Sequence, residues 1–156
     1  MVETVKVVGE AVLRDYPLRL WMSQQEHTDA LLREFHLIIG GQEAGAMSSA
    51  PCQLVELAEV FTRRFGSLIN KINDERHAAV DRGLDRVDSV VPMPEGTPAL
   101  MQQVAGVMHA VDEYCRDGDL LTLARSPELL ALSQWTLSEL TKQYEGADPT
   151  PWPGPF

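Results

Sequence analysis

The stretch LVELAEVFTRRFGSLINKINDERHAAVDRGLDRV, residues 54–87, holds the longest uninterrupted helical pattern in the chain. Its apolar residues recur at steps of three and four, which puts them on one face of an α-helix. Because such a helix is marginal alone in water, other segments must cover this face. Ser49 and Pro51 supply a capping hydroxyl and a first-turn proline, so we predict that the helix begins there. The apolar face comprises Leu54, Leu57, Ala58, Phe61, Phe65, Leu68, Ile69, Ile72, Ala79, Val80, Leu84 and Val87.

Three other segments combine helical periodicity with start and stop signals. Each opens at a proline or a capping hydroxyl and closes at a glycine, which is the usual asymmetry of helix ends. We expect these helices at residues 18–39, 97–117 and 126–145. A short apolar helix or turn that plugs the core is expected at residues 119–124, where leucines are concentrated.

The expected fold is all-α, a helical bundle of four main helices plus one short helix. The Val-Lys-Val-Val run at residues 5–8 is too brief to predict a strand, and the prolines in residues 88–98 indicate a loop. We assign residues 1–17 to an extended lead-in, 18–146 to the bundle domain and 147–156 to a proline-rich tail. The predicted core comprises Trp21, Leu32, Phe35, Phe61, Phe65, Leu68, Ile72, Val104, Val107, Met108, Val111, Leu130, Trp135 and Leu140.

The chain is acidic, with 23 Asp and Glu against 13 Lys and Arg and a net charge of -10. Residues 89–156 contribute most of this excess, with 9 acidic and 3 basic side chains. Nucleic acids and anionic membrane surfaces both require basic groups, so neither is an expected partner. The apolar runs are too short to span a membrane, and no secretory signal pattern opens the chain. We therefore expect a soluble cytoplasmic protein.

No pattern in the sequence predicts catalysis, a metal site or a cofactor. Cys52 and Cys115 are far apart and lack the spacing of a disulfide framework or a zinc site. Asp74 and His77 have the carboxylate-x-x-His spacing of metal centres in helical bundles. At about 100° per residue, however, Asp74 points away from the expected core. We therefore predict a protein that is not an enzyme.

A polar interruption of the apolar faces is a candidate site. In the long helix, Arg76 points inward, with Glu75 and His77 at the edge of the apolar face. In the first helix, Gln25 and Thr28 lie on the same arc as the expected core residues. These side chains could form one buried polar layer, which would either fix the register of the helices or line a small ligand pocket.

The tail is the most distinctive short stretch. Its alternating prolines restrict residues 149–156 to an extended or polyproline-like conformation. Exposed aromatic side chains are unfavourable in water, so Trp152 and Phe156 are expected to dock on a surface. That surface belongs either to this chain or its own dimer, or to the groove of a partner protein.

Three stretches carry a family resemblance: VGEAVLRDYPLRLW at residues 8–21, DLLTLA at 119–124 and TPWPGP at 150–155. They resemble small uncharacterised bacterial helical proteins associated with partner-switching modules. In such modules an anti-sigma-factor kinase, a STAS-domain antagonist and a phosphatase act together. The resemblance implies an accessory regulatory protein, and it transfers no functional residue to this chain.

The predicted function is that of a non-catalytic cytoplasmic regulatory or interaction protein, which binds a protein partner through helix faces and the tail. The alternative is a bundle that binds a small molecule or a metal through the polar layer. The length of the helix at residues 54–87 is unusual for a compact single-chain bundle, which also indicates a homodimer.

Overall fold

The computed structural model describes residues 5–43, 49–118 and 120–155, while the side chains at 38–43, 49–55 and 57 lie outside the description. Within these residues the chain forms two strands and four helices. Their order is β1 (Val7–Pro17), α1 (Leu18–Glu43), α2 (Ser49–Asp81), β2 (Arg86–Pro94), α3 (Thr97–Arg116) and α4 (Pro127–Tyr144).

The all-α prediction is wrong, because β1 and β2 pair as an antiparallel two-stranded sheet. The strands occupy most of the expected lead-in at residues 1–17 and of the expected loop at residues 88–98. In β1, Ala11 and Leu13 are fully buried, whereas Glu10 between Gly9 and Ala11 is exposed. This alternation is the period-two pattern of a strand with one face on the core.

The prolines of β2 are compatible with its position at the edge of the sheet. Val90 lies opposite Val12, and Pro92 lies two residues farther along β2. The N–H and C=O groups of Val12 bond the Gln143 side chain at 2.8 and 2.9 Å, so they point away from β2. Val12 and Val90 are therefore a non-hydrogen-bonded pair, and the backbone of Val90 and Pro92 faces the outer edge of β2. A proline at this edge removes no hydrogen bond from the ladder.

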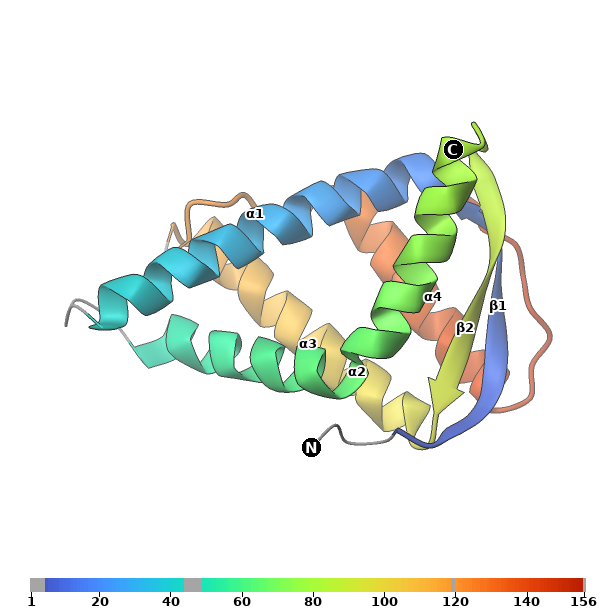
Figure 1. Cartoon of the computed structure of the whole chain (residues 1–156), viewed down its shortest axis with the longest axis horizontal. Coiled ribbons are helices and arrows are strands. Elements are labelled where there is room, and N and C mark those ends of the chain that lie inside the picture. Colours follow the sequence, from blue (N-terminus) through green and yellow to red (C-terminus); the bar gives the residue numbers. More distant parts are fainter. Residues whose placement is uncertain (1–4, 44–48, 119, 156) are drawn as a thin grey trace.

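Figure 1 shows the sheet at one end of the molecule, with α1 and α2 extending toward the other end. The sheet is flanked by helices, because α2 packs against β2 and α4 packs against β1. About midway along its length α2 changes direction (Figure 1). Gly66 and Ser67 lie in this part of the sequence, and such pairs are a known cause of helix kinks.

The helix boundaries follow the local signals in most places. α2 begins at Ser49 as predicted, but it ends at Asp81 because Gly83 adopts a left-handed backbone with φ of 79°. α1 continues through the two glycines that were expected to stop it. α4 begins as predicted, since the Ser126 hydroxyl accepts a hydrogen bond from the Leu129 N–H at 3.3 Å. No helix forms over residues 120–124.

The main core lies where the sheet meets α1, α2, α4 and the tail. It consists of Leu13, Tyr16, Leu18, Trp21, Ala79, Leu132 and Trp152. The predicted core residues found buried are Trp21, Phe35, Phe65, Val111 and Leu140. Those found half-buried are Phe61, Leu68, Ile72, Val104, Val107, Met108, Leu130 and Trp135.

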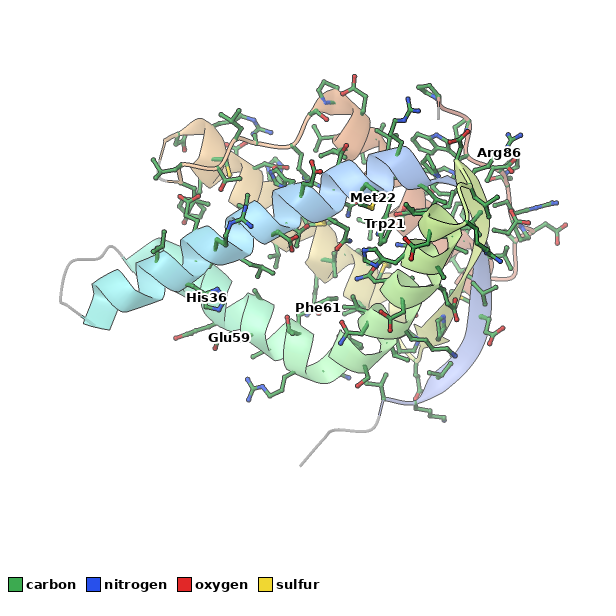
Figure 2. All side chains as sticks on the ribbon, turned by 45° about the horizontal axis from the view of Figure 1, so that its top comes forward. Trp21, Met22, His36, Glu59, Phe61 and Arg86 are labelled. Atoms are coloured by element: carbon green, nitrogen blue, oxygen red, sulfur yellow. The ribbon has the colours of Figure 1, made fainter. Side chains whose placement is uncertain are left out.

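The helix faces are incompletely covered away from the sheet, and the predicted core residue Leu32 is 40% exposed. Figure 2 shows Phe61 and Glu59 leaving α2 in different directions, and only Phe61 of the two is half-buried. The prediction assumed that the helices cover one another along their whole length. Instead, β1 and the tail supply much of the fully buried surface at one end of the molecule.

Candidate functional site

The proline-rich tail is docked on this chain through Trp152, whose side chain is only 7% exposed and belongs to the main core. The backbone N–H of Trp152 donates to the Arg14 carbonyl of β1 at 3.0 Å, and its indole N–H donates to the Pro155 carbonyl at 3.1 Å. The candidate partner-binding residue Trp152 is therefore a core residue. Phe156, the other candidate, lies outside the described residues.

Gly154 allows the tail to fold closely over the indole ring. A Cβ atom at this position would lie 2.5 Å from Cζ2 of Trp152, which is far inside van der Waals contact. Because glycine has no Cβ, the backbone can pass over the ring without displacing it. The backbone from Trp152 to Pro155 therefore folds closely back over the indole ring.

The buried carboxylate of Glu139 on α4 holds the tail through hydrogen bonds to Thr150. Glu139 is 1% exposed and accepts hydrogen bonds from the Thr150 N–H at 3.2 Å, the Thr150 hydroxyl at 2.5 Å and the Gln143 amide at 3.0 Å. Burial alone would raise the pKa of Glu139, but these hydrogen bonds and the charge of Lys142 hold that pKa below its ordinary value. We call this arrangement the tail clasp.

The docked tail forms one wall of an apolar hollow of about 580 Å³, which we call the Trp cleft. The first half of α4 forms the opposite wall, and α1 contributes one leucine. Glu128 is its only charged lining residue among those described. The lining consists of Leu20, Pro127, Glu128, Ala131, Gln134, Trp135, Trp152, Pro153, Gly154 and Pro155.

The sequence indicated only the tail side of the Trp cleft. Trp135 is a predicted core residue and Leu20 is not, because helical periodicity does not reveal which residues will meet an extended tail. The signal that could have pointed to α4 is the short distance in sequence between Trp135 and the tail. It allows the chain to turn at Gly146 and return along the same helix.

The loop before α4 exposes two leucines in a defined conformation. Leu121 and Leu123 are 89% and 80% exposed, so the predicted apolar plug is confined to Leu120, which is buried. The Glu34 carboxylate of α1 accepts hydrogen bonds from the Leu121 N–H and, at 2.8 and 2.6 Å, from the N–H and hydroxyl of Thr122. These bonds outweigh burial and hold the pKa of Glu34 below its ordinary value.

An ion pair secures the other end of this loop. The Arg125 guanidinium contacts the Asp112 carboxylate of α3 at 2.6 Å, and the two side chains are 9% and 2% exposed. Arg125 also donates to the Ser133 hydroxyl of α4 at 2.9 Å. Although burial raises the pKa of Asp112, the bonds and charge of Arg125 keep it below its ordinary value.

The structure brings only Arg76 of the five polar-layer candidates into the core. Arg76 is 9% exposed, and its guanidinium carbon lies 4.0 Å from the centroid of the Tyr16 ring. Its Nε–H donates to the Ser89 hydroxyl of β2 at 3.2 Å. Burial is the main influence on this group and lowers the pKa of Arg76.

The other four candidates do not form a buried layer with Arg76, although the charge of the exposed Glu75 acts on it. Thr28, Glu75 and His77 are exposed, and Gln25 is half-buried without a hydrogen bond to another described residue. His77 bonds the Asn73 carbonyl of its own helix at 2.9 Å, and its ring packs against Trp21 of α1. Figure 2 shows where Trp21 leaves α1. These side chains therefore do not form one polar layer in this structure.

Within the part of the chain that the structure describes, no three His, Cys, Asp or Glu side chains gather closely enough to hold a metal ion. None of its helices combines the length and apolarity needed to cross a membrane. No protein-family model, curated protein or solved structure matches this chain.

Proposed function

We propose that this chain is a non-catalytic cytoplasmic regulatory protein whose Trp cleft binds a protein partner of a signalling module. The observation that supports the proposal is the composition of the cleft. Two tryptophans, three prolines and a leucine line it, and Glu128 is the one carboxylate beside them. Concave apolar surfaces with few placed polar groups are typical of binding sites.

The chemistry of the Trp cleft indicates which segment of a partner fits it. Aromatic-lined grooves bind polyproline-like segments, because these lose little conformational entropy when they are bound. Tryptophan rings also attract cations, and Glu128 adds a negative charge. The net charge of -10 further favours a basic partner. The expected ligand is a proline-containing segment with an Arg or Lys side chain directed toward Glu128.

A matched pair of arginine substitutions on α4 tests this proposal. Ala131 and Ser138 are both exposed, and they share one face of α4 because they are two turns apart. Ala131 lines the Trp cleft and Ser138 does not. Ala131→Arg fills the cleft with a long cationic side chain, whereas Ser138→Arg adds the same charge outside it.

The probe is a short synthetic peptide of proline and arginine, titrated against the full chain and followed by tryptophan fluorescence. We expect Ala131→Arg to weaken binding at least about tenfold, which corresponds to about 1.4 kcal/mol. Ser138→Arg should bind like the original chain, and a peptide with glutamate in place of arginine should not bind. Equal binding by both variants, or no binding of the arginine peptide, would refute the proposal.

A further inference from the structure

A second hollow, of about 460 Å³, lies between β2 and the second half of α2. We call it the β2 groove. α2 lines it between Glu75 and Asp81, Arg82 lines it just after the end of α2, and β2 lines it from Val87 to Ser89. No residue of the Trp cleft contributes to it, so the two sites are separate.

The outer edge of β2 presents backbone groups beside this groove. The register that pairs Val12 with Val90 directs the N–H and C=O groups of Val90 away from β1. The backbone of Asp88 has the same orientation, because it lies two residues away on the same strand. β1 has a register shift opposite Asp88, where the Asp15 N–H donates to the Asp88 carboxylate at 3.0 Å. In the described residues, no other element bonds the backbone of Asp88 or Val90. An open strand edge of this kind can accept a further strand.

Pro92 limits how far such pairing can extend. Its backbone nitrogen faces the same edge but carries no hydrogen, so it cannot donate to an added strand. Prolines at sheet edges are a common protection against open-ended strand association. An added segment would therefore pair with the part of β2 that borders the groove and stop before Pro92.

A buried cation lines the same groove and forms no close ion pair with a described carboxylate, although the charge of the neighbouring Glu75 acts on it. Arg76 is about nine-tenths buried, and its Nε donates one hydrogen bond, to Ser89. The two terminal nitrogens bond no described residue and are not fully buried, so they are open to the groove that Arg76 lines. Buried charged groups in proteins are usually paired, because removing them from water is unfavourable. The Tyr16 ring supplies a cation–π contact, but it cannot accept the hydrogen bonds of the guanidinium fork.

We propose that the β2 groove binds an extended peptide segment, which adds as a strand to the outer edge of β2 and places a carboxylate on Arg76. The rim of the groove carries Glu75, Asp81 and Asp88, all of them exposed. These side chains disfavour a uniformly acidic ligand. The segment therefore carries its carboxylate between basic residues, which face the acidic rim.

The probe for this site is a synthetic peptide that alternates valine and lysine around one central glutamate. Its counterpart has glutamine in place of the glutamate. Binding to the full chain is followed by the backbone amide signals of β2 in NMR spectra. We expect the glutamate peptide to shift the signals of Asp88 and Ser89, and to bind about tenfold more tightly than the glutamine peptide because of Arg76.

Two substitutions at Val90 separate edge pairing from other contacts. Val90→Pro removes the outward N–H and leaves the ladder to β1 intact, as Pro92 does naturally. Val90→Thr keeps that N–H and serves as the matched control. Val90→Pro should reduce affinity at least about tenfold and Val90→Thr less than about twofold. Equal binding by the two variants would overturn the proposal.

Arg76→Met and Arg76→Lys test the carboxylate contact. Methionine keeps the length and apolar stem of the side chain without its charge, so the preference for glutamate over glutamine in the peptide should disappear. Lysine restores a positive charge and should restore part of that preference. A preference unchanged in Arg76→Met would overturn the assignment of Arg76, and the absence of β2 signal shifts with the original chain would overturn the whole proposal.

Discussion

The indole rings of Trp135 and Trp152 pack edge to face, with their centroids 5.3 Å apart and their planes at 73°. This geometry suits the quadrupoles of aromatic rings. Trp135 belongs to α4 and Trp152 to the tail, so the contact joins two segments separated by the turn at Gly146. The tail is consequently part of the core as well as one wall of the Trp cleft.

Replacing Trp152 with alanine should destabilise the fold strongly. The indole is almost fully buried against the main core, and large-to-small changes of buried aromatic residues cost about 3–5 kcal/mol. Urea denaturation of the full chain measures the change. Pro153→Ala, at an exposed position next to it, is the control and should change stability by less than about 1 kcal/mol. A loss below about 1 kcal/mol for Trp152→Ala would show that the tail is not core.

Two glycine-to-alanine substitutions should change the stability of the fold in opposite directions. Gly154→Ala brings a Cβ to 2.5 Å from the Trp152 ring and should cost about 1–3 kcal/mol, because the ring or the tail must move. Gly106→Ala, on an exposed position of α3 with no atom within 4 Å of the new Cβ, should stabilise by about 0.5–1 kcal/mol. Thermal unfolding of both variants is the measurement. Equal melting temperatures for the two variants would contradict the close approach at Gly154.

The tail clasp should make stability depend on pH in the acid range. The folded-state pKa of Glu139 lies below its ordinary value of 4.5. The contribution of this carboxylate to stability is therefore complete above pH 4.5 and is lost as the pH falls through the folded-state pKa. The free energies of unfolding of the original chain and of Glu139→Gln, measured in urea, should differ by about 1–3 kcal/mol at pH 7 and converge in acid. A difference that is constant with pH would contradict an ionised clasp.

Removing only one partner of the ion pair between Asp112 and Arg125 should destabilise the fold more than replacing both partners with apolar residues. Arg125→Met leaves the Asp112 carboxylate buried without its cation and should cost about 3–5 kcal/mol. Adding Asp112→Leu to this variant removes the unpaired charge and should recover a large part of the loss. The free energies of unfolding of Arg125→Met, Asp112→Leu and the double variant, measured in denaturant, give the coupling energy between the two residues. A double variant no more stable than Arg125→Met would indicate that the pair does not act as a unit.

Local signals were sufficient for most of the helical structure. The start of α2 at Ser49 and the cap of α4 at Ser126 depend on a few neighbouring residues, and both were predicted. The sheet was missed because β1 alternates over few residues and β2 carries Pro92 and Pro94, which usually indicate a loop. Pairing between segments about 70 or more residues apart made both of them strands, and no local pattern encodes that contact.

The candidate sites, like the sheet, depend on contacts between segments that are far apart in the sequence. Helical periodicity was enough to predict that Arg76 points inward, and hydrophobicity that Trp152 docks on a surface. The partners of these residues, Ser89 for one and Trp135 for the other, come from segments that the chain brings together only on folding. Periodicity and capping act between neighbours in the chain, whereas burial depends on which surfaces meet in space.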